Sequence, residues 1–566
     1  MKKILYVAAL AAVVSSCYKD KGSYDYSFDK VNYIEGISFL PEAFNGIKGL
    51  TVELQQPIGE DKVERVQVVL SQSLATDLKD VDFWWELTYR ENNKTVRDTV
   101  TTVGYLDVKL PAGKDMEYSV LLKVKDRVST LERYARFIIS TRAIFKNSIF
   151  VLHGTAGNMK LGNVEHVGGR DVVRTDAWAA VNTTDPNPFA NAVGLASTAY
   201  LDFGSRKTSE NLCVFNLDGS AALYQPFGLT SKYYPGYVLP KSDTPFLYRS
   251  IVETGNTTSG NDYKLLLSQD GKFYVARTYY SFHQPAGIDS KPADYEIKAA
   301  TITASSFVGW DERNNRFLYL SNGDAFAWEE KGGRDASLYQ MILDANVDLS
   351  GLGGELDLTT KDAVYAYIQY REDYESSHPF FLFRDNTTGR YYQYELTPVG
   401  GGKDEKSAST RGSDEGDKGE SVDGRPAFTI TGKALNRFTP TGQSTIIYNT
   451  WFTANNLFCA EDNKVYRYNA SSGDKVLIYT APEGYTVTHL RFRSEDSADF
   501  SGDLGRYLMI GLNNAGRGAV AEVLLTTAGD VDEEFVVPFY DRDAEGNHFG
   551  PIKDLVFARE YKYKKD

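Results

Sequence analysis

The chain has 566 residues, of which 42% are hydrophobic, 13% aromatic and 24% charged, with 48 glycines and a formal net charge of −14 at pH 7. This length exceeds what one hydrophobic core supports, so we expect more than one domain. The acidic balance argues against nucleic acid and against an anionic lipid surface as partners, because both require a basic face.

The N-terminus has the layout of a secretory signal peptide, with Lys2 and Lys3 ahead of an apolar run from Ile4 to Val14. This run of 11 residues is too short to cross a bilayer, because a helix needs about 20 apolar residues to do so. Small residues precede Cys17, as in the sites that lipoprotein signal peptidase cuts. We therefore expect residues 1–16 to be removed and Cys17 to carry acyl chains that anchor the protein. A plain secretory signal with an incidental cysteine is the alternative.

Residues 17–30 are polar and are predicted to form a lipidated tether. The short charged stretch Tyr18–Gly22 partly resembles the export tag of Bacteroidota surface lipoproteins. This resemblance implies a protein of the outer membrane, bound to the membrane by its lipid anchor and facing the cell exterior. A periplasmic orientation stays open.

Residues 31–142 are predicted to be strands alone, because their apolar residues alternate or run together as in half-buried strands. Six or seven short antiparallel strands in this space fit an Ig-like β-sandwich. The predicted strands are Leu50–Leu54, Val63–Leu70, Asp82–Tyr89, Thr95–Val103, Tyr118–Val124 and Tyr134–Ser140.

Three motifs of this segment resemble a PKD-type module: Phe83–Leu87 with its paired tryptophans, Leu110–Gly113, and Tyr118–Asp126 with its closing Val-Lys-Asp. Together with the stretch that starts at Cys17 and with Lys146–Leu152, they make residues 17–165 similar to the PKD-like lipoproteins of Bacteroidota. The resemblance implies an accessory role beside a SusC/SusD-type TonB-dependent transporter in nutrient uptake.

Beyond residue 142 a strand, turn, strand pattern recurs, and its shortest spacings are 52 residues. Repeats of about 50 residues are typical of four-stranded β-propeller blades, which bury their faces against one another. Residues 143–566 are therefore predicted to form a seven-bladed β-propeller, which makes the whole chain all-β. The seven turns are centred on Asn158, Gly219, Gly271, Gly323, Gly389, Asn463 and Gly516.

Two features complete the expected propeller. Residues 399–425 are rich in Gly, Ser, Asp and Lys without apolar periodicity, so they are predicted to be a disordered loop. Ser306–Glu312 and Thr488–Ser494 are candidate innermost strands, and Ile552–Glu560 is expected to supply the innermost strand of the first blade. Such an overlap of the chain ends removes an exposed sheet edge.

The sequence predicts no catalytic residues, no metal site and no cofactor. It contains no His-x-x-x-His, Cys-x-x-Cys or Gly-x-Ser-x-Gly motif. Cys213 and Cys459 are expected to be buried free thiols, with a disulfide as the alternative. The acidic stretches Asp532–Glu534 and Asp541–Asn547 are interpreted as solvated turns, although two carboxylates on different blades could serve a glycosidase.

Two aromatic loops between blade turns are the candidate ligand-binding segments. Rigid rings on exposed connections stack on sugars or pack on peptide side chains at small entropic cost. Packing of the same rings between blades is the alternative. The candidate residues are Tyr233, Tyr234, Tyr237, Tyr279, Tyr280, Phe282 and His283.

The sequence thus favours a non-catalytic envelope lipoprotein that binds glycan or peptide nutrients or docks on a SusC/SusD-type transporter. A propeller glycosidase or polysaccharide lyase is the first alternative, and it requires paired carboxylates at the central channel. An adhesin or structural envelope protein is the second, and it requires a broad, flat contact face.

Overall fold

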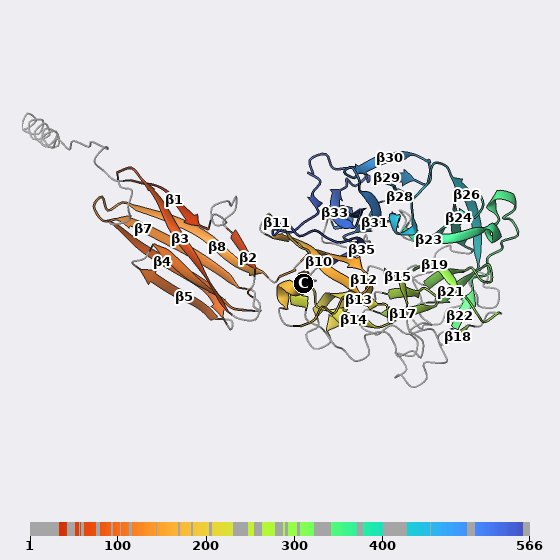
Figure 1. The fold of residues 1–566 in the computed structure, drawn as a ribbon, viewed down its shortest axis with the longest axis horizontal. Helices are drawn as coiled ribbons and strands as arrows, with labels where there is room; N and C mark the ends of the chain where they lie inside the picture. The colour runs from red at the N-terminus through yellow and green to blue at the C-terminus, as the bar shows by residue number, and fades with distance from the viewer. Residues whose placement is uncertain are drawn as a thin grey trace, which may run out of the picture. The chain divides into compact units, whose positions relative to one another are not determined.

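A computed structural model shows an all-β chain of two compact units, Met1–Ile144 and Phe145–Asp566 (Figure 1). Among the described residues, α2 (Ala177–Val181) is the one α-helix. The structure describes residues 33–41, 51–55, 57, 61–74, 80–91, 94–101, 104–112, 116–142, 144–145, 147–167, 170–182, 185–202, 207–229, 247–253, 263–277, 287–288, 292–302, 306–321, 341–370, 377–399, 427–452, 454–494 and 504–558.

The first unit is a sandwich of two sheets. One sheet has the order β1 (Ile34–Leu40), β3 (Lys62–Gln72), β6 (Tyr105–Leu110). The other has the order β2 (Thr51–Gln55), β8 (Glu132–Arg142), β7 (Glu117–Asp126), β4 (Val81–Glu91), β5 (Lys94–Thr101). All pairs are antiparallel except β2 with β8.

The core of the sandwich follows from strict alternation along its strands. In β6 every second residue is buried, and β7 shows the same period. Trp85, Val108 and Leu122 are fully buried between the two sheets. The six predicted strands overlap β2, β3, β4, β5, β7 and β8, whereas β1 and β6 were not predicted. A register irregularity beside Gly36 breaks the pattern of β1.

The described strands of the second unit form seven sheets, numbered here in chain order. Sheet 1 is β11 (Arg170–Arg174), β10 (Asn158–Val167), β9 (Ser148–Thr155), β35 (Ile552–Ala558). Sheet 2 is β12 (Ala192–Asp202), β13 (Lys207–Asn216), β14 (Ala221–Tyr224). Sheet 3 is β15 (Tyr248–Glu253), β16 (Tyr263–Ser268), β17 (Phe273–Arg277).

Sheet 4 is β19 (Ile297–Ile302), β20 (Ser306–Asp311), β21 (Arg316–Ser321), β22 (Met341–Asp344), β18 (Gly287–Ile288). Sheet 5 is β23 (Lys361–Tyr370), β24 (Ser377–Asp385), β25 (Tyr391–Pro398), β26 (Phe428–Leu435). Sheet 6 is β27 (Ile446–Tyr448), β28 (Asn456–Glu461), β29 (Lys464–Asn469), β30 (Lys475–Thr480). Sheet 7 is β31 (Thr486–Phe492), β32 (Tyr507–Asn514), β33 (Arg517–Leu524), β34 (Phe539–Tyr540).

Short 3₁₀ turns connect some of these strands. They are η3 (Phe227–Leu229), η5 (Gly354–Leu356), η6 (Leu358–Thr360), η8 (Gln443–Thr445) and η9 (Leu504–Arg506). Each sheet therefore consists of strands that are close in the sequence, with one exception. The exception is β35, which comes from the far end of the chain and pairs antiparallel with β9 in sheet 1. This is the pairing that the sequence predicted for Ile552–Glu560.

Aromatic and aliphatic side chains pack sheets 2 to 6 each on the next sheet in the chain, and sheet 7 packs on sheet 1 through Met509, Ile149 and Leu555. Trp310 of sheet 4 meets Phe383 of sheet 5 with ring centroids 5.3 Å apart. Further junctions are formed by Phe215 and Tyr248 (sheets 2 and 3), Tyr367 and Tyr448 (sheets 5 and 6), and Phe458 and Phe492 (sheets 6 and 7). The second unit is thus β-rich and propeller-like.

The predicted innermost strand of the fourth repeat is wrong. The sequence predicts Ser306–Glu312 as this strand, whereas the turn that it predicts at Gly323 lies outside the described residues. In the structure Ser306–Asp311 is β20, the second strand of sheet 4, and the edge strand is β19. The turn between β20 and β21 contains Asn315, whose φ is +51°. In the corresponding turns of other sheets a glycine adopts the positive φ.

The prediction of Thr488–Ser494 as an innermost strand and four of the predicted glycine turns agree with the structure. Thr488–Ser494 overlaps β31, the edge strand of sheet 7. Gly219, Gly271, Gly389 and Gly516 all have positive φ in turns between paired strands. Of the predicted loop 399–425, only Val399 is described, and it is exposed.

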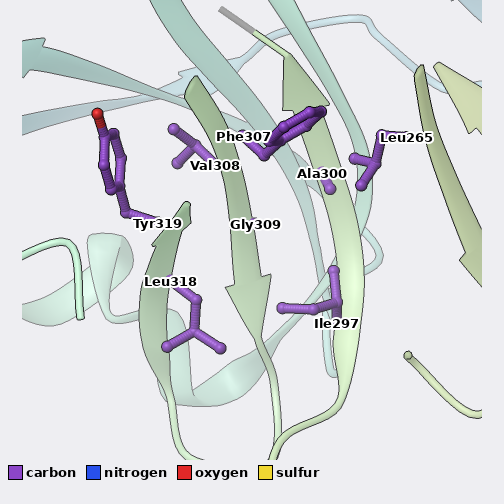
Figure 2. Close-up of a pocket in the computed structure, with 8 residues that line it drawn as sticks. All are labelled: Leu265, Ile297, Ala300, Phe307, Val308, Gly309, Leu318 and Tyr319. Carbon is purple, nitrogen blue, oxygen red and sulfur yellow. The ribbon is translucent and has the colours of Figure 1, made fainter. Parts of the chain in front are cut away.

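A small apolar cavity lies between sheets 3 and 4 (Figure 2). Leu265 and Ile297 line it from two sheets, with Phe307 and Leu318 beside them. Its volume is about 10 Å³, roughly the room that the centre of one water molecule needs. The cavity is therefore a packing defect and not a ligand pocket.

Gly518 marks a close approach between sheet 7 and the segment that leads into β35. Its N–H donates to the carbonyl oxygen of Phe549 at 2.9 Å, and a Cβ at this position would collide with the carbonyl oxygen of Gly550. We expect Gly518→Ala to lower the free energy of unfolding by about 1–3 kcal/mol, because backbone must move to make room. Chemical denaturation measures this change.

Gly351→Ala is the matched control, because no atom lies within 4 Å of a Cβ at that position. This variant is expected to keep its stability within about 0.5 kcal/mol. Equal stabilities of the two variants would contradict the close approach at Gly518.

Candidate functional site

Six edge strands of the second unit share a β-bulge near their start. A bulge adds one residue to a strand. The added residue has no partner in the neighbouring strand, and its side chain points in a different direction from that of a regular strand residue. The strands are β12, β15, β19, β23, β31 and β35, and each lies at one edge of its sheet. The bulged residues are Val193, Arg249, Lys298, Val364, Thr488 and Lys553.

Three of these six residues are basic, and Lys298 organises the charged group around it. Its Nζ lies 2.6 Å from Glu296 Oε1 and 3.4 Å from Glu312 Oε2. The hydrogen bond from Lys298 lowers the pKa of Glu296, whereas burial raises the pKa of Glu312. Two carboxylates whose pKa values shift in opposite directions can serve as the acid and the base of a reaction. A purely structural ion-pair network produces the same pattern of pKa shifts.

Arg249 of β15 reaches the same group. Its Nη1 donates to the carbonyl oxygen of Ile297 at 3.2 Å. Burial lowers the pKa of Arg249, while Glu312 and Glu296 oppose that shift by their negative charge. The start of sheet 4 thus gathers two cations and two carboxylates, and these charges largely neutralise one another.

A second polar group joins sheets 7, 1 and 2. Asp554 of β35 is 6% exposed, and its Oδ2 accepts from the N–H of Leu195 in β12 at 2.9 Å. Arg491 of β31 places Nη2 at 3.8 Å from Asp554 Oδ1. Because burying an isolated charge is costly, these contacts hold three edge strands in place rather than leaving an open reactive group.

Tyr248 closes this second group from sheet 3. Its ring packs against Gly194 in β12, where a Cβ would overlap the ring, and its hydroxyl approaches the carbonyl oxygen of Leu195 at 3.4 Å. Burial raises the pKa of Tyr248 far above its ordinary value, so the hydroxyl stays protonated. The Tyr248 side chain therefore acts as a fixed hydrogen-bonding group.

A charged network also fills the junction of sheets 7 and 1. Arg493 donates to Glu522 twice, from Nε to Oε1 at 2.6 Å and from Nη2 to Oε2 at 2.5 Å, and Glu522 is 1% exposed. His166 lies between Arg493 Nη2, at 2.7 Å from its Nε2, and Asp171 at its Nδ1. Tyr540 donates to Asp171 at 2.8 Å. Because these side chains bind one another across sheets 7 and 1, the network helps to hold the two sheets together.

The predicted ligand-binding residues and the anchor lie outside the described residues. This applies to Cys17, to Tyr233, Tyr234 and Tyr237, and to Tyr279, Tyr280, Phe282 and His283. The structure neither brings them together nor separates them. The bulged residues and the Glu296–Glu312 group were missed, since a bulge leaves no mark in a strand pattern.

Other predictions from the sequence concern residues that the structure describes. Cys213 and Cys459 are buried and free, as predicted. Asp543 in the stretch Asp541–Asn547 accepts from the N–H groups of Glu545 and Asn547 and from the Thr175 hydroxyl, so it forms a turn as expected. Within the described ranges, no three His, Cys, Asp or Glu side chains are grouped to hold a metal ion. No described helix is long and apolar enough to span a membrane.

Comparison with known proteins gives a family match for the N-terminal part of the chain. A family model described as the PKD-like family matches residues 17–186, which covers the first unit from residue 17 onward and continues into sheet 1 and α2. The N-terminal domain is therefore PKD-like. A search of curated proteins found no match.

Solved structures resemble the chain only loosely. A quinonprotein alcohol dehydrogenase-like protein from Bacteroides thetaiotaomicron is 10% identical, with a TM-score of 0.38 over 92% of this chain and 99% of that one. An apocarotenoid oxygenase from Synechocystis is also 10% identical, with a TM-score of 0.36 over 89% of this chain and 97% of that one. Likenesses of this degree carry no conclusion about activity.

His153 shows how the C-terminal segment is held on sheet 1. Its ring is 3% exposed, its Nε2 lies 2.7 Å from the carbonyl oxygen of Thr175, and its Nδ1 accepts from the N–H of Gly550 at 2.9 Å. Both nitrogens thus have fixed roles in the neutral ring. Burial lowers the pKa of His153 below its ordinary 6.5, although the Thr175 carbonyl opposes the shift.

This shift predicts a loss of stability in acid. As the pH falls through 6.5, the unfolded chain takes up a proton at His153 that the folded chain resists, so the free energy of unfolding declines. We expect the melting temperature of the wild type to fall more steeply than that of His153→Gln between about pH 7.5 and about pH 5.5. Thermal melts at several pH values measure the difference. Parallel pH profiles would contradict the role of His153.

Proposed function

We propose that the protein is a non-catalytic lipoprotein of the outer membrane, anchored at Cys17 and facing the cell exterior. The observation that carries this proposal is where the PKD-like match begins. It starts at residue 17 and leaves out residues 1–16, which have the layout of a signal peptide. A mature chain that begins at Cys17 would explain this limit.

We further propose that the second unit is a closed seven-bladed propeller. The pairing of β35 with β9 supports closure, because it joins the two ends of the unit within one sheet. The packing of sheet 7 on sheet 1 supports it as well. A closed ring would leave no open sheet edge at the seam and would form a rigid body for binding.

In this proposal the protein is an accessory subunit of a SusC/SusD-type uptake system and binds glycan or peptide nutrients. The inner polar groups support binding over catalysis, because Asp554, Glu522 and Asp543 are each engaged by neighbouring donors of the fold. The acidic chain is unsuited to nucleic acid.

Purification from detergent-solubilised outer membrane tests the proposal. The wild type is expected to carry acyl chains, to fractionate with the outer membrane and to elute with a TonB-dependent transporter in stoichiometric amount. Cys17→Ser is expected to lose the acyl chains and the membrane fraction, because several acyl chains are needed for firm anchorage. Cys213→Ala, which leaves Cys17 intact, is the matched control.

Mass spectrometry and metabolic labelling with a fatty acid measure the acylation. An unmodified wild type would refute the anchor, and a wild type that elutes alone would refute the accessory role.

A glycosidase is the second candidate, and the Glu296–Lys298–Glu312 group is the observation that favours it. In this alternative Glu312, whose pKa burial raises, would be the acid and Glu296 the ionised partner. We prefer the binding role because the Lys298 ammonium occupies the space between the two carboxylates.

Hydrolysis assays on oligosaccharides separate these two candidates. The binding role predicts no turnover by the wild type. Turnover that falls at least about a thousandfold in Glu312→Gln, while Glu355→Gln stays active, would establish the enzyme instead. Glu355 is an exposed carboxylate of η5 in the same unit and serves as the control.

A further inference from the structure

Two exposed aromatic rings lie in one cross-strand row on the outer face of the first unit. Trp84 of β4 is opposite Lys123 of β7, and Lys123 is opposite Tyr134 of β8 (Figure 1 labels the strands). Trp84 is 51% exposed and Tyr134 57% exposed, whereas the adjacent Trp85 is fully buried. Successive side chains of a strand point to opposite faces, so the pair of tryptophans places one ring in the core and one in solvent.

The spacing of the two rings follows from sheet geometry. Adjacent strands lie about 4.8 Å apart, so residues two strands apart in one row are separated by roughly 10 Å. Two linked pyranose units span a similar length. Each ring could therefore stack on one sugar of a chain that crosses the strands of this flat face.

The polar groups around the rings suit sugar hydroxyls. Lys123 Nζ lies 2.8 Å from Glu132 Oε1, and the Tyr134 hydroxyl donates to Glu132 Oε2 at 2.6 Å. Next to Trp84 on the same strand, Glu86 is paired with Arg97 at 3.0 Å. Fixed carboxylate and cationic groups beside an exposed ring can accept from and donate to hydroxyl groups in the same plane.

The charge of this face argues for an uncharged partner. Three of its carboxylates have a cation in contact: Asp82 with Arg127, Glu86 with Arg97, and Glu132 with Lys123. Glu117, Lys125 and Arg136 also face outward on β7 and β8, so the face carries charges of both signs and does not strongly favour a ligand of one sign.

We propose that the row Trp84–Lys123–Tyr134 is a binding platform for a neutral glycan chain, which we name the aromatic platform. The proposal rests on the binding function above and assigns that function to the PKD-like unit instead of the loops of the second unit. The rings supply the stacking surface, and the flanking ion pairs fix the sugar orientation.

Affinity electrophoresis of the full chain in detergent tests the platform. The probes are amylopectin, hydroxyethylcellulose, xylan, galactomannan and, as an acidic comparison, polygalacturonate. The wild type is expected to be retarded by at least one neutral probe. Trp84→Ala and Tyr134→Ala are each expected to raise the dissociation constant on the order of tenfold, and the double variant to abolish retardation, because each loses one stacking surface.

Tyr105→Ala is the matched control. Tyr105 is a 36% exposed aromatic residue of the same unit, on β6 in the other sheet, so its loss is expected to leave retardation unchanged. Trp84→Phe keeps a ring and is expected to restore most of the affinity. Both controls separate loss of stacking from loss of folding, which thermal melts check independently.

Several results would overturn the proposal. These are no retardation by any neutral probe, binding to polygalacturonate alone, or equal retardation of the wild type and the double variant. Loss of transporter co-purification in the double variant with unchanged retardation would assign the face to protein docking instead. A failed platform leaves the acylation and co-purification tests unaffected, so the two proposals fail separately.

Discussion

The second unit depends on the pairing of β35 with β9, which joins Ile552–Ala558 to Ser148–Thr155 across about four hundred residues of chain. Without β35, β9 would be an exposed edge strand whose N–H and C=O groups lack partners on one side. Bringing such distant segments together costs chain entropy, although the cost grows only slowly with loop length. Further hydrogen bonds and apolar contacts hold the segment that leads into and forms β35.

Those contacts come from different sheets and secure the same short segment. His153 binds Gly550 from sheet 1, Gly518 binds Phe549 from sheet 7, and Asp554 binds Leu195 in sheet 2. Each buries a polar group that would be costly if left without a partner. The segment before and within β35 is therefore held by hydrogen bonds as well as by the apolar packing of Leu555 and Phe557.

The two units use aromatic residues in different ways. In the second unit, rings such as Trp310 and Tyr367 lie between sheets and provide the packing that separate sheets need. In the first unit, the sandwich already covers both inner faces, so an outward ring such as Trp84 has no sheet to pack on. The exposed rings of the aromatic platform therefore contribute little to the core, and this leaves them available for a ligand.

The sequence by itself determined the all-β class, the strands around Trp85 and most of the repeated turns, because alternation and turn chemistry are local. The pairing of the C-terminal strand was predictable because the repeat pattern left that strand without a turn of its own. The sequence failed at sheet 4, where Asn315 turns the hairpin without glycine, and it left no sign of the bulges at Arg249 and Lys298. Only the tertiary structure decided which charges meet, such as Lys298 with Glu312, and which tryptophan of Trp84 and Trp85 faces solvent. The reason is physical: cross-strand register and the packing of sheet on sheet join residues that no sequence spacing connects.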